Sequence, residues 1–225
     1  MELEPRCWYK DVCLLDSSKC SSNCIRYKEM RFMIKNSGLS FDRSYPEALY
    51  AGIDRDSFKS LKSIKDNIED LIVLGGNVYI TSTITGNGKT SWAIKLLLKH
   101  FDNVWAGNGF VPRGLFVHVP TLLDSFKNFE DTTLFMRKEL IKTVDLVVWD
   151  DIGSSKLSPF DISQLLILID TRMVCNKANI FTGNIVTLED LQQTVGSRLA
   201  SRIWNNSKIV QFNGKDRRGT ITDNQ

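Results

Sequence analysis

The sequence has no apolar run long enough to cross a membrane. Its most apolar stretches, 71–74 and 165–169, are far shorter than the roughly 20 residues that a membrane helix needs. The first residues are polar, charged and interrupted by Pro5, which is not the pattern of a secretory signal peptide. We therefore expect a cytoplasmic protein, in a reducing compartment that disfavours disulfides.

The chain also lacks a strong excess of either charge. It has 29 basic and 26 acidic residues, and the net charge of +3 is too small to indicate nucleic-acid binding by itself. One basic cluster lies near the carboxyl terminus, opposed only by Asp216: Arg198, Arg202, Lys208, Lys215, Arg217 and Arg218. With 225 residues, 42% of them hydrophobic, the chain can form one medium domain plus a small appendage.

Four of the five cysteines lie near the amino terminus, with five, six and three residues between them: Cys7, Cys13, Cys20 and Cys24. Four thiolates can enclose a zinc ion and supply folding energy, which residues 1–50 would need because they show no sustained apolar periodicity. The spacing lacks the two-residue knuckles of common zinc sites, so unligated thiols or disulfides stay open as alternatives. We predict a zinc-binding domain over residues 1–50, ending in a linker.

From about residue 54 onward, helical and strand-like segments alternate. We expect strands at 77–81, 115–119, 144–149, 179–182 and 208–212. We expect helices at 57–71, 89–101, 121–129, 132–143, 159–174, 188–194 and 196–204. This alternation is typical of a parallel sheet covered by helices, so the predicted fold class is α/β with three layers over residues 51–225.

A glycine-containing loop at 83–90 joins the first predicted strand to the next helix, which is the context of a phosphate-binding loop. Its glycines would let successive N–H groups face a phosphate at a helix N-terminus. Lys89 would reach the β- and γ-phosphates, and the Thr90 hydroxyl would bind magnesium. Thr83 replaces the usual first glycine, but the later glycines make the turn; a plain turn with an exposed lysine is the alternative. The predicted nucleotide-binding residues here are Gly86, Asn87, Gly88, Lys89, Thr90 and Ser91.

Polar residues close two of the predicted strands. Asp150 and Asp151 follow the apolar strand at 144–149, and the carboxyl ends of parallel strands converge on a ligand crevice. Asp150 would hold magnesium and Asp151 would polarise the attacking water, unless the pair only caps a helix. Asn184, alone or with Thr182, would contact the γ-phosphate or that water; a simple turn is the alternative.

Together these motifs resemble the AAA+ ATPases of the helicase-loader type, the DnaC and DnaI group with its transposition relative IstB. The resemblance covers about residues 50–220 and rests on 86–90, 149–153, 182–184, 197–202 and 214–218. It implies an AAA+ P-loop domain that uses ATP and Mg²⁺. It also implies that Arg202 is the arginine finger that completes a neighbouring subunit's site, with Arg198 as the alternative. Arg218, or Arg217, resembles the second sensor arginine, although a solvated basic tail would have the same sequence pattern.

The resemblance further implies a function: ATP-dependent loading of a DnaB-type replicative helicase onto single-stranded DNA during the initiation of replication. The cysteine-rich domain would bind the helicase, and the compact layout suggests a phage-encoded member acting in the bacterial host cytoplasm. Residues available to bind the strand, which could equally belong to the core and a solvated face, are Lys127, Arg137, Lys138, Lys142, Phe126, Phe129 and Phe135. Two alternatives stay open: an IstB-like transposition helper on duplex DNA, and a zinc-bearing adaptor that nucleotide switches without turnover.

Overall fold

The computed structural model describes residues 23–39, 54–104, 109–127 and 132–213. These residues form a five-stranded sheet in which every neighbouring pair is parallel, in the order β2-β3-β4-β1-β5. The strands are β1 (Asn77–Thr81), β2 (Gly114–His118), β3 (Leu146–Asp150), β4 (Ala178–Gly183) and β5 (Ser207–Gln211). The predicted α/β class is confirmed, and each predicted strand begins and ends within two residues of an observed one.

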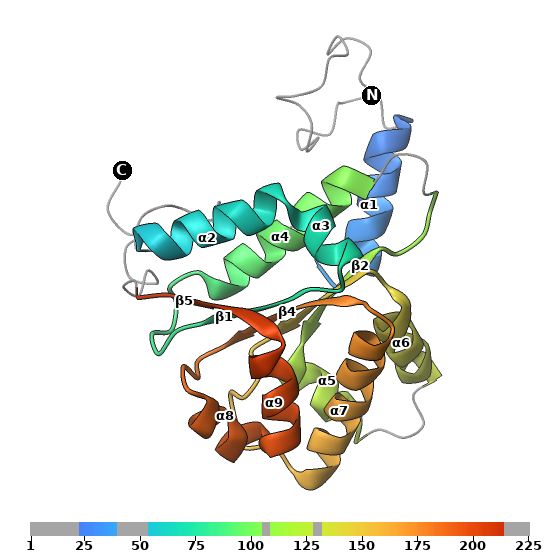
Figure 1. Cartoon of the computed structure of the whole chain (residues 1–225). Helices are drawn as coiled ribbons and strands as arrows, with labels where there is room; N and C mark the ends of the chain where they lie inside the picture. Colours follow the sequence, from blue (N-terminus) through green and yellow to red (C-terminus); the bar gives the residue numbers. More distant parts are fainter. Residues whose placement is uncertain (1–22, 40–53, 105–108, 128–131, 214–225) are drawn as a thin grey trace, which may run out of the picture.

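Helices cover both faces of the sheet (Figure 1). One layer contains α1 (Ile25–Asn36), α2 (Arg55–Asp66), α3 (Ile68–Val73) and α4 (Lys89–Val104). The other contains α5 (Val119–Ser125), α6 (Thr132–Thr143), α7 (Pro159–Val174), α8 (Leu188–Val195) and α9 (Ser197–Asn205). The sheet is therefore the middle layer of three, as the alternating sequence pattern predicted.

Side chains of the central strands alternate between the two cores. Val78 and Ile80 of β1 pack with the α1–α4 layer, whereas Tyr79 between them packs with the α5–α9 layer. In β3, Val148 joins the first core and Trp149 the second. Because both faces of a covered parallel sheet are buried, its strands read as continuous apolar runs.

Helix α1 is an element that the sequence pattern did not indicate. It buries Met30, Met33 and Ile34 in the core shared with α4, and the Arg26 guanidinium lies 3.0 Å from Asp102 of α4. Charged residues alternate with these apolar ones, which hides the helical periodicity. Part of the segment predicted to be a separate domain thus packs on the α/β core. The division near residue 50 stays a prediction, since residues 40–53 lie outside the described ranges.

Two predicted helices differ from the observed ones. The helix expected at 57–71 is broken at Asn67, whose side-chain amide and backbone N–H both bond to the carbonyl of Ser63. The helix expected at 121–129 begins earlier, at Val119, and ends at Ser125. Pro120 fits in its first turn because the missing N–H has no helical acceptor there.

A fully buried arginine ties the second helical layer to the sheet. The Arg172 guanidinium donates to the carbonyls of Ile141 (2.6 Å) and Val144 (2.9 Å) at the end of α6, and to Oδ1 of Asn179 (2.7 Å) in β4. Carbonyls at a helix C-terminus lack partners inside the helix, so the arginine satisfies groups that burial would otherwise leave unpaired. Burial lowers the pKa of Arg172 to about 9, which leaves it charged at neutral pH.

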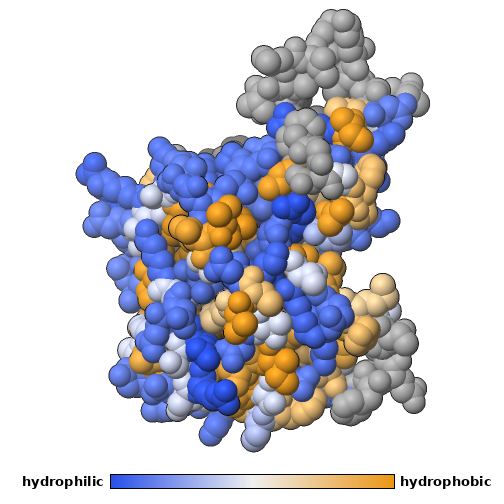
Figure 2. All heavy atoms as spheres, turned by 45° about the vertical axis from the view of Figure 1, so that its right-hand side comes forward, coloured by the Kyte–Doolittle hydropathy of each residue, from blue (hydrophilic) through white to orange (hydrophobic). Residues whose placement is uncertain are grey.

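On the face shown in Figure 2, hydrophobic residues lie in separate patches among hydrophilic ones. Within the described ranges, no helix combines the length and the apolar composition that crossing a membrane requires.

Candidate functional site

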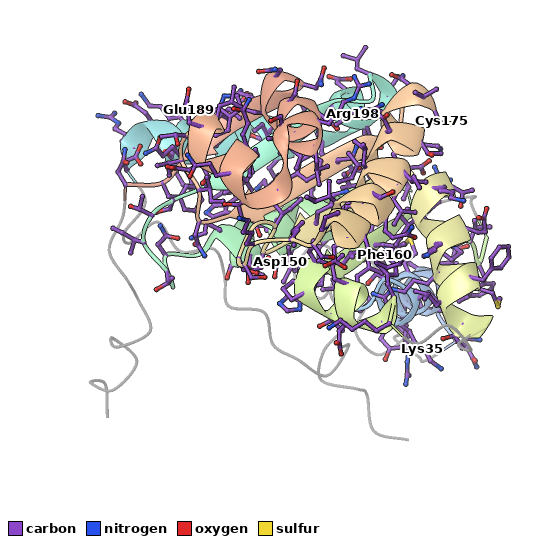
Figure 3. All side chains as sticks on the ribbon, turned by 90° about the horizontal axis from the view of Figure 1, so that it is seen from below. Lys35, Asp150, Phe160, Cys175, Glu189 and Arg198 are labelled. Atoms are coloured by element: carbon purple, nitrogen blue, oxygen red, sulfur yellow. The ribbon has the colours of Figure 1, made fainter. Side chains whose placement is uncertain are left out.

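The predicted site residues follow three neighbouring strands at the carboxyl end of the sheet. Strand β4 lies between β1 and β3, so the loop after β1 and the acidic pair at the end of β3 flank the end of β4. Asp150 marks this edge in Figure 3. The topology therefore brings together residues that are about 60 to 100 positions apart in the chain, at the edge where such sheets bind ligands.

The loop after β1 has the backbone geometry that its glycines allow. Gly86 and Gly88 have φ values of 71° and 98°, a region in which other residues are strained. Asn87 is fully buried, and its amide donates to Ser82 Oγ at 2.6 Å. The Lys89 ammonium donates to the carbonyl of Ile84 (2.8 Å) and to Oδ1 of Asn87 (3.3 Å). The lysine is thus held over its own loop at the start of α4, with Ser91 half-buried in the first helical turn.

A short hydrogen bond joins the loop helix to β3. The Thr90 hydroxyl donates to Oδ1 of Asp150 at 2.7 Å, and the Thr182 hydroxyl donates to the same oxygen at 2.8 Å. Asp150 itself is buried. A hydroxyl and a carboxylate in contact are the hard oxygen ligands that Mg²⁺ prefers, so this pair fits the predicted magnesium site.

Asp151 has an unusual backbone conformation. Its φ of 62° lies in the left-handed region, which non-glycine residues seldom adopt. The backbone N–H of Asp151 donates to the Thr182 hydroxyl at 3.0 Å, and that of Ile152 donates to the Thr182 carbonyl at 2.8 Å. The two adjacent carboxylates therefore do not continue one extended strand: Asp150 ends β3, and Asp151 begins the turn.

Asn184 lies one residue beyond β4 and is half-buried. Its Oδ1 is buried, and no described residue bonds to it. Such an orphaned acceptor is costly unless a ligand or water donates to it, which fits the predicted role beside a phosphate or an attacking water. Thr182 does not share this free capacity, because its hydroxyl bonds to the acidic pair instead.

Close packing at the end of β4 involves residues that the sequence analysis missed. A Cβ on Gly183 would lie 2.6 Å from the Tyr79 hydroxyl and 2.8 Å from the Ile152 carbonyl, so only glycine fits. The hydroxyls of Tyr79 (2.9 Å) and Thr81 (2.5 Å) both donate to the carbonyl of Ile185. Burial raises the pKa of Tyr79 to about 12. The sequence signal that could have revealed this support for the turn at Asn184 was Tyr79, a tyrosine inside an apolar strand.

The two candidate finger arginines lie on α9. Arg202 Nε is 2.7 Å from Oδ1 of Asp170 on α7, and both side chains are partly exposed. Arg198 is exposed, and it lies apart from Asp150 in Figure 3. An exposed arginine away from its own chain's acidic pair fits a role in a neighbouring subunit. Arg217 and Arg218 lie outside the described residues.

Little of the predicted zinc site can be examined. Cys7, Cys13 and Cys20 lie outside the described residues, and Cys24 is a half-buried free thiol just before α1. Among the residues that the structure describes, no group of three or more histidine, cysteine or acidic side chains could hold a metal ion. Zinc binding therefore stays a prediction.

The residues considered for strand binding fall into two groups. Phe126 is buried in the second core, with the Lys138 ammonium 4.3 Å from its ring centroid. Two further lysines form ion pairs with acidic residues three positions earlier in the chain: Lys127 with Asp124, and Lys142 with Glu139. Phe135 and Arg137 on α6 are exposed, whereas Phe129 lies outside the described residues. Phe126 thus belongs to the core, whereas Phe135 and Arg137 remain candidates for binding single-stranded DNA.

Comparisons with solved structures show proteins of similar fold. The crystal structure of the DnaC helicase loader matches with a TM-score of 0.58 and 18% identity, over 81% of this chain and 98% of that one. The DnaI structure matches with a TM-score of 0.57 and 21% identity, over 74% and 93%. AMPPCP-bound DnaA from Aquifex aeolicus matches with a TM-score of 0.58 and 18% identity, over 77% and 51%. No protein-family model and no curated protein sequence matches the chain. The predicted resemblance to the DnaC and DnaI group is confirmed at the level of the fold.

Proposed function

We propose that this chain is an AAA+-type ATPase that loads a DnaB-type ring helicase onto single-stranded DNA. The observation that carries the proposal is the 2.7 Å contact between Thr90, at the start of the loop helix, and Asp150, at the end of β3. The similarity to DnaC, which extends over 98% of the DnaC chain, supports the choice of a loader.

The chain's own groups divide the binding of ATP among them. The N–H groups of the loop at 86–88 and the dipole of α4 would bind the β-phosphate. The Lys89 ammonium would exchange its 2.8 Å bond to the Ile84 carbonyl for bonds to phosphate oxygens. Thr90 and Asp150 would hold magnesium, which supplies positive charge next to the phosphate oxygens. Ser91 would assist in the first turn of the same helix.

Hydrolysis requires an activated water and stabilisation of the charge on the γ-phosphoryl group as it is transferred. Asp151 would accept a proton from the water that attacks the γ-phosphate, and the orphaned Oδ1 of Asn184 would accept a hydrogen bond that orients this water. Arg202 of one subunit would complete the site of the next, as Arg218 would within its own subunit. ATP would then control how subunits assemble on the helicase and on the strand.

The pocket is tested by Lys89→Ala with Lys95→Ala as the matched control. Both lysines lie on α4, but Lys95 lies over the Trp92 ring, 5.3 Å from its centroid, and not on the loop. We expect Lys89→Ala to abolish nucleotide binding, measured by calorimetry, and Lys95→Ala to retain it. Equal binding by both variants would refute the assignment of the loop.

The loader role is tested by co-elution with DnaB-type helicases, with and without ATP. A stable complex that transfers the helicase to single-stranded DNA is the expected result. ATP-dependent filaments on duplex DNA without helicase affinity would indicate a transposition helper instead. Nucleotide binding without turnover, with or without single-stranded DNA, would indicate an adaptor.

A further inference from the structure

The Thr182 hydroxyl lies between the two acidic residues of the candidate site. It donates to Oδ1 of Asp150 at 2.8 Å and accepts from the backbone N–H of Asp151 at 3.0 Å. Thr182 is only 2% exposed, and it belongs to β4, the strand that separates β3 from β1. The hydroxyl is therefore part of the protein interior and does not line the surface that a nucleotide would contact.

The direction of both hydrogen bonds is determined by chemistry. A backbone N–H can only donate and an ionised carboxylate can only accept, so the single hydroxyl proton must point at Asp150. Valine has nearly the same shape but can make neither bond. Thr182 thus constrains the magnesium ligand and the adjacent residue through one atom.

The backbone of Thr182 adds a second constraint on Asp151. Its carbonyl accepts from the N–H of Ile152 at 2.8 Å, so the N–H groups on both sides of the Asp151 Cα are bonded to one residue. A left-handed φ in a non-glycine residue persists only where its surroundings enforce it. These two bonds enforce it here, and they fix the direction in which the Asp151 carboxylate leaves the backbone.

We propose that Thr182 is a positioning residue that holds Asp150 and Asp151 in the relative orientation that hydrolysis requires. The inference rests on the proposed ATPase function and extends it to a residue that need not contact the nucleotide. It predicts that the Thr182 hydroxyl acts on magnesium use and turnover, and not on the affinity for nucleotide itself.

The test compares Thr182→Val with Thr182→Ser, which keeps the hydroxyl. Loss of a group that orients a metal ligand commonly costs 10- to 100-fold in metal affinity or activity. For Thr182→Val we expect the Mg²⁺ concentration for half-maximal hydrolysis to rise about 10-fold and kcat to fall about 10- to 100-fold. Affinity for ADP measured without Mg²⁺ should be unchanged, and Thr182→Ser should recover most of both losses.

Ser37→Ala is the matched control for losing a buried hydroxyl. Ser37 Oγ is fully buried, donates to the Ile34 carbonyl (2.8 Å) and accepts from the N–H of Leu39 (3.2 Å), at the end of α1. This control should lower stability without changing the Mg²⁺ requirement. Should Thr182→Val not fold, Thr182→Ala makes the same comparison.

The outcomes separate this inference from the proposed function. A wild-type protein that binds no nucleotide would overturn both. An active wild type with unchanged Mg²⁺ dependence and kcat in Thr182→Val would overturn only the role of Thr182. An equal loss of ADP affinity without Mg²⁺ would also overturn it, because the residue would then support the pocket as a whole.

Discussion

Arg202 Nε lies 2.7 Å from Oδ1 of Asp170, so the arginine that the family resemblance predicts to act in a neighbouring subunit is held by an acidic residue of its own chain. The two side chains are 47% and 28% exposed, and ion pairs at such positions contribute about 0–1 kcal/mol. Arg202 can therefore give up this ion pair for a stronger contact with a phosphate at little cost in free energy.

The first prediction concerns this arginine. Arg202→Ala should lower ATP turnover by about 10³-fold or more, because a finger arginine stabilises charge on the transferred phosphoryl group. Nucleotide affinity should change little, and Asp170→Asn should remain stable and active. Mixing Arg202→Ala with Lys89→Ala subunits should restore some turnover, since a site is intact wherever the Arg202→Ala subunit provides the pocket and the Lys89→Ala subunit provides the arginine. Loss of turnover in Arg198→Ala but not in Arg202→Ala would transfer the role to Arg198.

The second prediction concerns the exposed face of α6. If single-stranded DNA binds there, Phe135→Ala should weaken binding about 10-fold, the effect of losing one stacked base. Arg137→Ala should reduce the salt dependence of binding, because a phosphate contact releases counterions. Phe160→Ala is the control, since Phe160 is also exposed but lies on α7. Equal effects of Phe135→Ala and Phe160→Ala in fluorescence anisotropy would count against a site on α6.

A third prediction is the zinc content. Purified protein should contain about one zinc ion per chain by elemental analysis, since four thiolates complete a tetrahedral site. Cys24→Ser should lose the metal while keeping α1, because Cys24 is the N-cap residue and makes no side-chain cap bond that serine could not make. Cys175→Ser, at an exposed thiol, should keep the metal. Wild-type protein without zinc would leave the cysteines as unligated thiols or disulfides.

The fourth prediction is the loss of stability in acid. Burial opposes ionisation of Asp145, but the Lys177 ammonium at 3.1 Å and the Arg113 guanidinium outweigh it and hold the pKa of this carboxyl below its usual value. A lowered folded-state pKa gives stability that is present above the unfolded-state value of 3.8 and is lost as the pH falls through the folded-state pKa. Acid should therefore remove this contribution below about pH 4.

Asp145→Asn isolates that contribution in urea unfolding at pH 7 and pH 3. At pH 7 the substitution should lower the free energy of unfolding by about 1.5–3 kcal/mol, the range for hydrogen bonds to charged groups. At pH 3 the difference from wild type should shrink. Asp124→Asn, which removes an exposed ion pair with Lys127, should change stability little at either pH. A constant difference between pH 7 and pH 3 for Asp145→Asn would contradict the assignment.

Much of the sheet was predictable because its strands are local patterns. The apolar run that ends at Asp150 is buried on both faces, and the glycines near Lys89 mark a specific turn between strand and helix. Parallel topology then implies that Asp150, Asn184 and the loop share one edge of the sheet. This part of the site needs no long-range information beyond the pairing of strands.

Other features could not be read from the sequence because they depend on distant partners. Arg172 lies in an apolar helix and would normally be assigned to its solvent face. It is buried instead, and its guanidinium donates hydrogen bonds to the Ile141 carbonyl of α6 and to Oδ1 of Asn179. Nothing near Thr182 in sequence indicates that its hydroxyl bonds across to Asp150 and Asp151. Likewise, the apolar positions of α1 become a core face only against α4.

The packing of α1 on α4 has a mechanical consequence. Helix α4 starts at Lys89 and has 16 residues, so it is about 24 Å long and stiff along its axis. The ion pair between Arg26 and Asp102 joins α1 to α4 near the carboxyl end of α4. A force applied to the chain before α1 would therefore reach one end of α4, and the other end of this stiff helix carries Lys89, the lysine that we propose binds phosphate.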